Sequence, residues 1–196
     1  MHKTVINLSQ NCHITVIKLC DAASKGNIGR IRFLLASGVD INCSRIRTPL
    51  YWAAYSGRTD VDKLLLDEGA NPEKGSEQED NNPLYWAIFL SRRDMVRFLL
   101  DAGANPNSVC SLSGNYPLAG AAKYGQVDMV LDLLKAGADP NKTDIDGERT
   151  ALDEATSYDR RSSPKVGKDM IKMLLDAGAH PTSTSTSVLY SNLMYM

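Results

Sequence analysis

The chain has 196 residues, a formal net charge of −1, 43% hydrophobic and 23% charged residues, which is an ordinary composition for a globular protein. The near-neutral charge gives no reason to expect nucleic acid or a membrane surface as a partner, and no run of about 18 apolar residues predicts a membrane span. The four cysteines are irregularly spaced, so we expect reduced thiols and no disulfide framework.

Residues 1–13 precede the pattern that organises the rest of the chain, and we interpret them as an N-terminal extension. Polar residues from Asn7 to His13 interrupt its apolar stretch, so the segment is a poor signal peptide. His13 lies close in sequence to Cys12 and Cys20, but these residues lack the four-ligand spacing of a zinc site. We therefore expect no metal site here.

From residue 14 onward the chain repeats itself. The pentapeptide PLYWA occurs at residues 49–53 and again at 83–87, a separation of 34 residues. A leucine recurs at spacings of 31, 34, 34 and 34 residues, as Leu19, Leu50, Leu84, Leu118 and Leu152. A glycine recurs at spacings of 31, 34, 34 and 41 residues, as Gly38, Gly69, Gly103, Gly137 and Gly178. A period of this length is typical of stacked structural repeats.

Each segment predicts a pair of short helices, and the second segment shows the pattern best. Thr48 provides a helix cap, and Pro49 suits the first helical position, where a missing N–H loses no hydrogen bond. Gly57 then breaks the helix, a second helix carries apolar residues over 61–66, and Gly69 supplies a left-handed C-cap. One such pair cannot bury its apolar face alone, so the pairs must stack into an α-solenoid.

These segments resemble the ankyrin repeat, whose pattern is T-P-L-H-x-A-A-x-x-G-H-x-x-V-V-x-L-L-L-x-x-G-A-D-x-N. The second segment reads TPLYWAAYSGRTDVDKLLLDEGANP, and five copies cover residues 14–181: 14–42, 43–73, 74–107, 108–141 and 142–181. The resemblance implies an all-α ankyrin-repeat solenoid with β-turn fingers between its helix pairs. It also implies a concave face of fingers and first helices that binds another protein. The end copies are looser, with Lys18 and Asp21 at positions that are Pro or apolar in the middle copies.

Trp52 and Trp86 occupy the position that faces the neighbouring repeat in this family, and Gly120 occupies it in the fourth copy. We expect both tryptophans to pack between repeats, with Gly120 making room for Trp86. The alternative is a role in stacking on a ligand. Tyr51 and Tyr85 replace the family's usual His.

The two residues before the mid-repeat glycine are variable in ankyrin repeats and face the partner. Here they place large side chains in successive repeats: Tyr55, Phe89, Leu90, Lys123, Tyr124 and Tyr158. Because contiguous aromatic patches mark binding sites, we predict that this row contacts a partner. The alternative is that each ring folds down onto the neighbouring repeat and closes a gap.

The predicted fingers differ in charge. The second is basic, with Arg45 and Arg47, the third is acidic over 73–82, and the fourth places Leu112 at its tip. Alternating charge would orient a partner along the fingers, so we include Arg45, Arg47 and Leu112 among the partner-binding residues. The alternative is that these are simply solvated loops.

The fifth copy contains an insertion over 158–169, which holds Pro164 and Gly167 and predicts an exposed loop between its two helices. Within it, Ser162 and Ser163 are candidate phosphorylation sites, because arginines precede them and a proline follows. Residues 182–196 form a tail that is rich in Ser and Thr and then apolar. The tail either is disordered or folds back over the last repeat.

The sequence carries no P-loop, dinucleotide-binding, HExxH or GxSxG motif, so we expect no enzyme activity, no catalytic residues and no cofactor. The leading hypothesis is a monomeric adaptor or inhibitor that binds a protein or peptide. We expect a cytoplasmic location. Two alternatives stay open: the nucleus, and a host cytosol if the protein is a secreted bacterial effector. The alternatives are an enzyme or effector that uses the inserted loop or the N-terminal Cys and His, and a homo-oligomeric scaffold.

Overall fold

The computed structural model describes residues 2–42, 47–75, 83–109, 116–144, 146–147, 149–161, 163–183 and 185–186, with side chains from residue 14 onward except 159–161. The chain divides into two compact units, Met1–Ala104 and Asn105–Met196. In the described parts of both units the regular elements are α-helices, so the expected all-α repeat fold is confirmed. None of the described helices combines the length and apolar character needed to cross a membrane.

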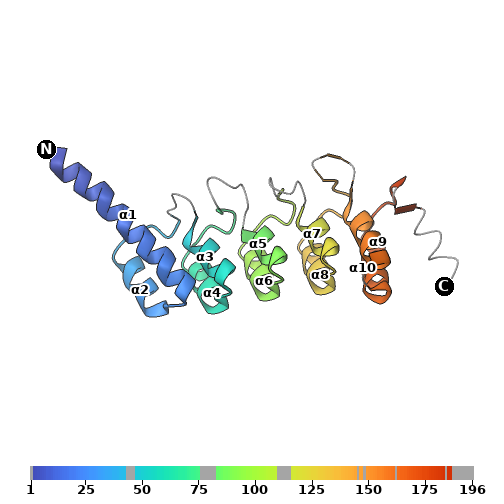
Figure 1. Cartoon of the computed structure of the whole chain (residues 1–196), viewed down its shortest axis with the longest axis horizontal. Helices are drawn as coiled ribbons and strands as arrows, with labels where there is room; N and C mark the ends of the chain where they lie inside the picture. The colour runs from blue at the N-terminus through green and yellow to red at the C-terminus, as the bar shows by residue number, and fades with distance from the viewer. Residues whose placement is uncertain are drawn as a thin grey trace. The chain divides into compact units, whose positions relative to one another are not determined.

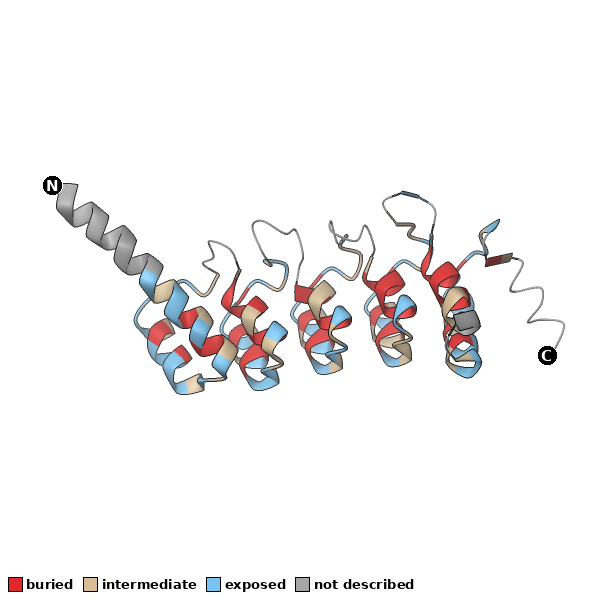
Figure 2. Ribbon diagram, in the orientation of Figure 1, coloured by how far each residue is buried: buried red, intermediate tan, exposed pale blue. Residues whose placement is uncertain are grey.

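Unit 1 consists of three helix pairs that lie side by side (Figure 1). They are α1 (His2–Lys25) with α2 (Ile28–Ala36), α3 (Pro49–Ser56) with α4 (Thr59–Asp67), and α5 (Pro83–Phe89) with α6 (Arg93–Asp101). The first helices pack in the order α1, α3, α5, and α4 packs against α6. Buried and exposed residues alternate along these helices, as expected for helices packed on one side (Figure 2).

Unit 2 contains α7 (Pro117–Lys123) with α8 (Val127–Lys135), and α9 (Ala151–Arg161) with α10 (Pro164–Asp176). Here α9 packs against α7 and α10 against α8. The stacking of pairs is therefore the same within each unit, as the repeat period predicts.

The ends of α3 form as the sequence predicts. The Thr48 side chain accepts a hydrogen bond from the Tyr51 N–H at 3.2 Å, and Pro49 starts the helix. Gly57 ends it in the left-handed region, with φ of 68°. A Cβ atom at this position would lie 2.6 Å from Cζ of Arg92, so the next repeat's guanidinium occupies the space that the glycine leaves open. Gly57 is thus required both for its backbone angle and for the close approach.

Asparagine side chains link successive fingers within each unit. Asn107 Oδ1 accepts a hydrogen bond from the Asp139 N–H at 2.8 Å, and its Nδ2 donates to the Gly137 carbonyl at 3.0 Å. Asn42 bridges to Asn71 and Gly69 in the same way, and Asn141 bridges to His180 and Gly178. Each amide satisfies one donor and one acceptor of the following turn, which explains why the repeat places Asn there.

One core position breaks the apolar pattern. Asp62 in α4 is 1% exposed, whereas the equivalent position in the other four repeats is aliphatic: Ile31, Val96, Val130 and Ile171. Its Oδ1 has no hydrogen-bond partner among the described residues. Burial, and then the Asp60 carboxylate, raise the pKa of Asp62 to about 8, while Arg92 acts in the opposite direction. The side chain is therefore largely protonated at neutral pH.

The prediction of a loop over 158–169 is wrong. Helix α9 continues through Arg161 and α10 starts at Pro164, so most of the insertion lengthens these two helices. Pro164 and Gly167 suggested a loop, but proline is well tolerated at a first helical position, and the extended backbone of Ser163 (φ −150°) is the N-cap before it. Ser163 is half-buried, and Ser162 lies outside the described residues.

The start of the C-terminal tail packs onto the last repeat. The Thr182 hydroxyl donates to the Asp153 carboxylate, and the Ser185 hydroxyl accepts a hydrogen bond from the Thr182 N–H at 2.9 Å. Ser185 is fully buried. Residues 182–183 and 185–186 therefore lie against the end of unit 2. The apolar part of the tail, which the fold-back alternative concerns, lies outside the described residues, so that alternative stays a prediction.

Candidate functional site

Two large side chains stand out on the first helices of unit 1. Tyr55 on α3 is 48% exposed, and Phe89 at the end of α5 is 45% exposed. They occupy the same position in successive repeats, and α3 packs directly against α5. Both rings of the predicted row are therefore accessible to a partner on this unit.

Tyr55 and Phe89 belong to a continuous cluster of aromatic side chains, which we call the aromatic platform: Tyr51, Trp52, Tyr55, Tyr85, Trp86 and Phe89. Trp86 on α5 connects the two helices of the platform. Its ring lies edge-on to the Tyr51 ring of α3, with 5.7 Å between the centroids, and to the Tyr55 ring, with 6.1 Å between the centroids. Edge-to-face contact at these distances is favourable for aromatic pairs. The packing role predicted for Trp86 between repeats is confirmed.

The two halves of the platform have the same internal geometry. Tyr55 stacks on Tyr51 at 6.1 Å with an angle of 8° between the rings, and Phe89 stacks on Tyr85 at 6.2 Å with an angle of 16°. Each pair is four residues apart, so the helix brings the rings together. Because each exposed ring is supported by its neighbour, little rotamer freedom remains to be lost when a partner binds.

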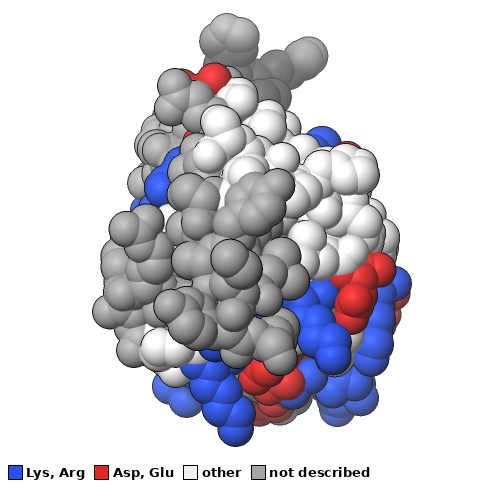
Figure 3. All heavy atoms as spheres, turned by 90° about the vertical axis from the view of Figure 1, so that its right-hand side faces the viewer, with Lys and Arg blue, Asp and Glu red and all other residues white. Residues whose placement is uncertain are grey.

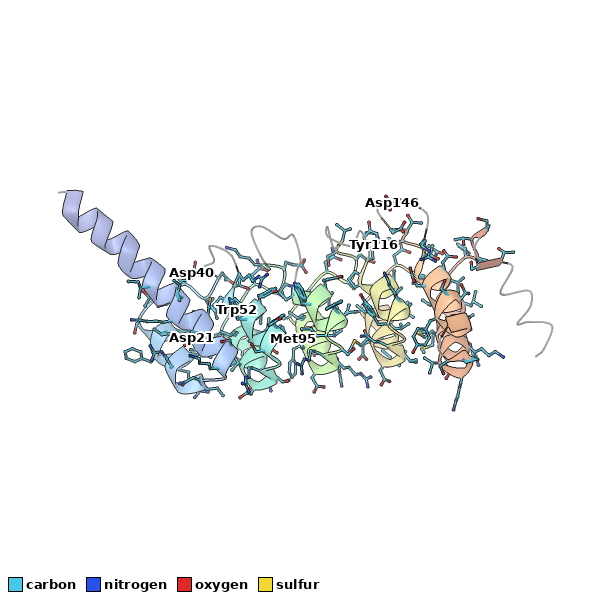
Figure 4. All side chains as sticks on the ribbon, viewed as in Figure 1. Asp21, Asp40, Trp52, Met95, Tyr116 and Asp146 are labelled. Carbon is cyan, nitrogen blue, oxygen red and sulfur yellow. The ribbon has the colours of Figure 1, made fainter. Side chains whose placement is uncertain are left out.

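Trp52 extends the platform along α3 (Figure 4), where it is half-buried and contacts Tyr51 and Tyr55. The expected fit of Gly120 against Trp86 would join the two units and stays a prediction. In unit 2, Gly120 itself is buried within α7.

The finger residue Arg47 packs at the edge of the platform. Its Cζ lies 4.7 Å from the Tyr51 ring centroid and 5.6 Å from that of Trp52, which is cation–π distance. Its carbonyl accepts a hydrogen bond from the Cys20 Sγ at 3.6 Å. Arg47 is thus half-buried against the rings and adds positive charge at one border of an aromatic surface. The neighbouring finger residue Arg45 lies outside the described part, as does Leu112.

The other residues of the predicted row differ in how far they are exposed. Leu90 is half-buried in unit 1, while Lys123 and Tyr124 in unit 2 are exposed, Tyr124 by 39%. Tyr158 is half-buried, and a Cβ at Gly125 would lie 2.2 Å from its Cζ. Its ring therefore covers the glycine of the preceding repeat, as the packing alternative describes, and a partner contact of Tyr158 stays a prediction.

Sequence reasoning found the exposed rings but missed the depth of the cluster beneath them. The signal was present, because Tyr51 with Tyr55 and Tyr85 with Phe89 have the i, i+4 spacing that stacks side chains on a helix. The contact of Arg47 with the rings had no such signal, since it depends on the path of a finger.

The chemistry of this surface is apolar and aromatic contact with one adjacent guanidinium. In the described part of the chain, no group of three His, Cys, Asp or Glu side chains is placed to hold a metal ion. Asp62, whose pKa is raised, lies in the core of α4 and not on the platform.

Comparison with known proteins agrees with the repeat structure. Two family models described as ankyrin repeats match residues 19–110 and 120–175. The E3 ubiquitin-protein ligase hecd-1 of Caenorhabditis elegans is 42% identical over 52 residues, which is 26% of this chain and 2% of that protein. The matched stretch is therefore only a small part of that relative's length.

Proposed function

This chain belongs to the ankyrin-repeat family, and on that basis we propose that unit 1 binds a partner protein through the aromatic platform on α3 and α5. Ankyrin repeats are generally protein–protein interaction modules whose repeats build extended binding surfaces. In this role the chain acts as an adaptor or an inhibitor by occupying a surface of its partner, and the chain itself performs no chemistry.

The observation that carries the proposal is the paired exposure of Tyr55 and Phe89 on supported rings. Each is nearly half exposed although large apolar side chains gain free energy by burial. Aromatic residues that are fixed in place and then covered on binding supply most of the affinity at protein interfaces. A partner that lays apolar side chains across Tyr55 and Phe89 would cover both rings at once.

Arg47 suggests how the partner is oriented. A guanidinium held over Tyr51 has its position set before binding, so an acidic or carbonyl group of the partner at this border would meet a prearranged donor.

We propose that Lys123 and Tyr124 form a separate contact on unit 2. Both are exposed on α7 and in the turn that follows it.

The test is capture of partners from cell lysate by the wild type and by the double variant Tyr55→Ala/Phe89→Ala, followed by mass spectrometry. The matched control is Lys172→Ala/Leu175→Ala, which changes two exposed residues on α10 that have no proposed role in binding. We expect a protein that the wild type and the control capture and the platform variant loses. Identical capture by the platform variant, with its circular dichroism unchanged, would show that the rings serve packing alone.

We further propose that the protein acts as a monomer in a reducing, cytoplasmic compartment. The irregular spacing of the cysteines supports this proposal, and the Cys20 Sγ donates a hydrogen bond to the Arg47 carbonyl as a thiol. Light scattering at two protein concentrations tests the monomer, since a molecular mass that rises with concentration would contradict it.

A further inference from the structure

The outer face of the first repeat combines exposed apolar and basic residues. Ile14 and Ile17 on α1 are 51% and 56% exposed, and Phe33 on α2 is 69% exposed. Lys18 and Arg30 are exposed as well. With Asp21, which lies on α1 (Figure 4), these residues form what we call the end face. None of them belongs to the aromatic platform.

The next repeat shows that these positions belong to a surface that stacking covers. The residue equivalent to Ile17 is Thr48, which is 2% exposed, and the residue equivalent to Arg30 is Val61, which is fully buried. Leu64, the counterpart of Phe33, is half-buried. The first repeat therefore presents to solvent the same side that the second repeat buries.

A terminal repeat needs a polar outer face to stay soluble. Asp21 in place of a tryptophan and Arg30 in place of an aliphatic residue satisfy that need. Solubility does not explain Ile14, Ile17 and Phe33, because a face made only to meet water would carry polar residues there too. Three large apolar side chains on one end are therefore evidence of an interaction surface.

The charge around these apolar residues identifies the kind of partner. Residues 14–36 carry Lys18, Lys25, Arg30 and Arg32 against Asp21 alone, a formal charge of +3 in a chain whose net charge is −1. Asp21 already pairs with Lys25 at 2.8 Å. Lys18 and Arg30 make no ion pair with any described residue. By contrast, positive and negative side chains are intermixed on the face shown in Figure 3.

We propose that the end face binds an acidic amphipathic segment of a partner protein, whose apolar side chains cover Ile14, Ile17 and Phe33 while its carboxylates face Lys18 and Arg30. Acidic partners gain from the unpaired cations, both in orientation and in association rate. A second copy of this chain is disfavoured as the occupant, because two faces with an excess of positive charge repel each other.

The probe is a labelled synthetic peptide of about 18 residues, long enough to hold a helix, with Leu on one face and Glu on the other. Its partner peptide has Lys in place of every Glu. Affinity for the full chain is measured by fluorescence anisotropy, and amide chemical shifts of the wild type locate the bound peptide. We expect the acidic peptide to bind at least about tenfold more tightly and to shift the amides of α1 and α2.

Two variants separate the apolar contribution from the charge. Ile17→Ser/Phe33→Ser removes apolar contact, and Lys18→Glu/Arg30→Glu reverses charge. Both pairs are exposed, so we expect both variants to fold. Each should weaken acidic-peptide binding by at least about tenfold, whereas Tyr55→Ala/Phe89→Ala should leave it unchanged.

Three results would overturn the proposal. The first is equal affinity for the two peptides, or chemical shifts that map outside α1 and α2. The second is sedimentation with phosphatidylserine vesicles that both end-face variants lose, without a preference between the peptides, which would assign the face to a membrane. The third is a concentration-dependent dimer that Ile17→Ser/Phe33→Ser abolishes, which would assign the face to self-association.

Discussion

The two units share one backbone plan but fill the same repeat position with different chemistry. In unit 1 the position after the leucine that recurs in each repeat holds Tyr51 and Tyr85, which stack with other rings. In unit 2 the fifth repeat holds Asp153 there, fully buried and bonded to Thr150 N–H at 2.9 Å and Thr150 Oγ1 at 2.8 Å. The repeat therefore fixes which residues are buried, and either ring packing or complete hydrogen bonding can fill the site.

The largest expected effect is on the ring-packed side of this comparison. Trp86→Ala should lower the free energy of unfolding of unit 1 by about 3–5 kcal/mol, because it removes the ring that connects α3 and α5. Chemical denaturation monitored by Trp52 fluorescence measures the change. Trp86→Phe is the control, because it keeps a ring and removes the indole N–H, which is buried without a partner among the described residues. A loss below about 1 kcal/mol for Trp86→Ala would place the ring outside the core.

The hydrogen-bonded side should be affected next. Asp153→Ala should destabilise unit 2 by about 2–3 kcal/mol, because it leaves the buried Thr150 donors and the Thr182 hydroxyl without their acceptor. Amide hydrogen exchange should rise over residues 182–186, which Asp153 holds against the repeat. Thr182→Val is the comparison, since it keeps the Thr150 bonds of Asp153 and removes the Thr182 hydroxyl with its contacts to Asp153 and Ser185. Unchanged exchange over 182–186 would mean that the tail is held by other contacts.

Asp62 offers a test in which the substitution should raise stability, because its buried Oδ1 has no hydrogen-bond partner among the described residues. Asp62→Val, the residue that α6 and α8 carry, should stabilise unit 1 by about 1–3 kcal/mol at neutral pH. In the wild type the folded-state pKa of about 8 exceeds the ordinary 3.8, so stabilisation is full below pH 3.8 and is lost as the pH rises through 8.

Denaturation of the wild type at several pH values between these limits measures that loss directly. The free energy of unfolding should fall as the pH rises, and Asp62→Val should remove most of the fall. Asp60→Asn is the control, because Asp60 is exposed and contributes only the second cause of the raised pKa. A wild type that becomes more stable as the pH rises from 4 to 8 would contradict the burial of a protonated Asp62.

The sequence predicted the fold well because its signals are local and repeated. Thr48, Pro49 and Gly57 mark the two ends of one helix within ten residues, and the same marks recur at a fixed period. The contact between Asp153 and Thr182 had no such signal, because the two residues are 29 positions apart. The insertion was misread because Pro164 can end a helix or begin one, and the choice depends on packing against α8 and α9.

For the candidate site, the sequence identified the exposed rings and left open whether each would pack or bind. From the sequence, both Tyr55 and Tyr158 were predicted to contact a partner. Only the structure separates them, because the path of the backbone at Gly125 lets Tyr158 fold over it while Tyr55 stays nearly half exposed. An exposed fraction is a property of neighbours, which one repeat period cannot specify.

The smallest expected effect on stability is the most informative for function. Tyr55→Ala/Phe89→Ala should lower the free energy of unfolding of unit 1 by only about 1–2 kcal/mol, because both rings are nearly half exposed and Trp86 stays in place. Denaturation followed by Trp86 and Trp52 fluorescence measures it, with Tyr124→Ala as a control of similar exposure in unit 2. A loss as large as that of Trp86→Ala would make the rings part of the core. A small loss in stability together with a large loss in partner capture fits only a surface that is built to be covered by another molecule.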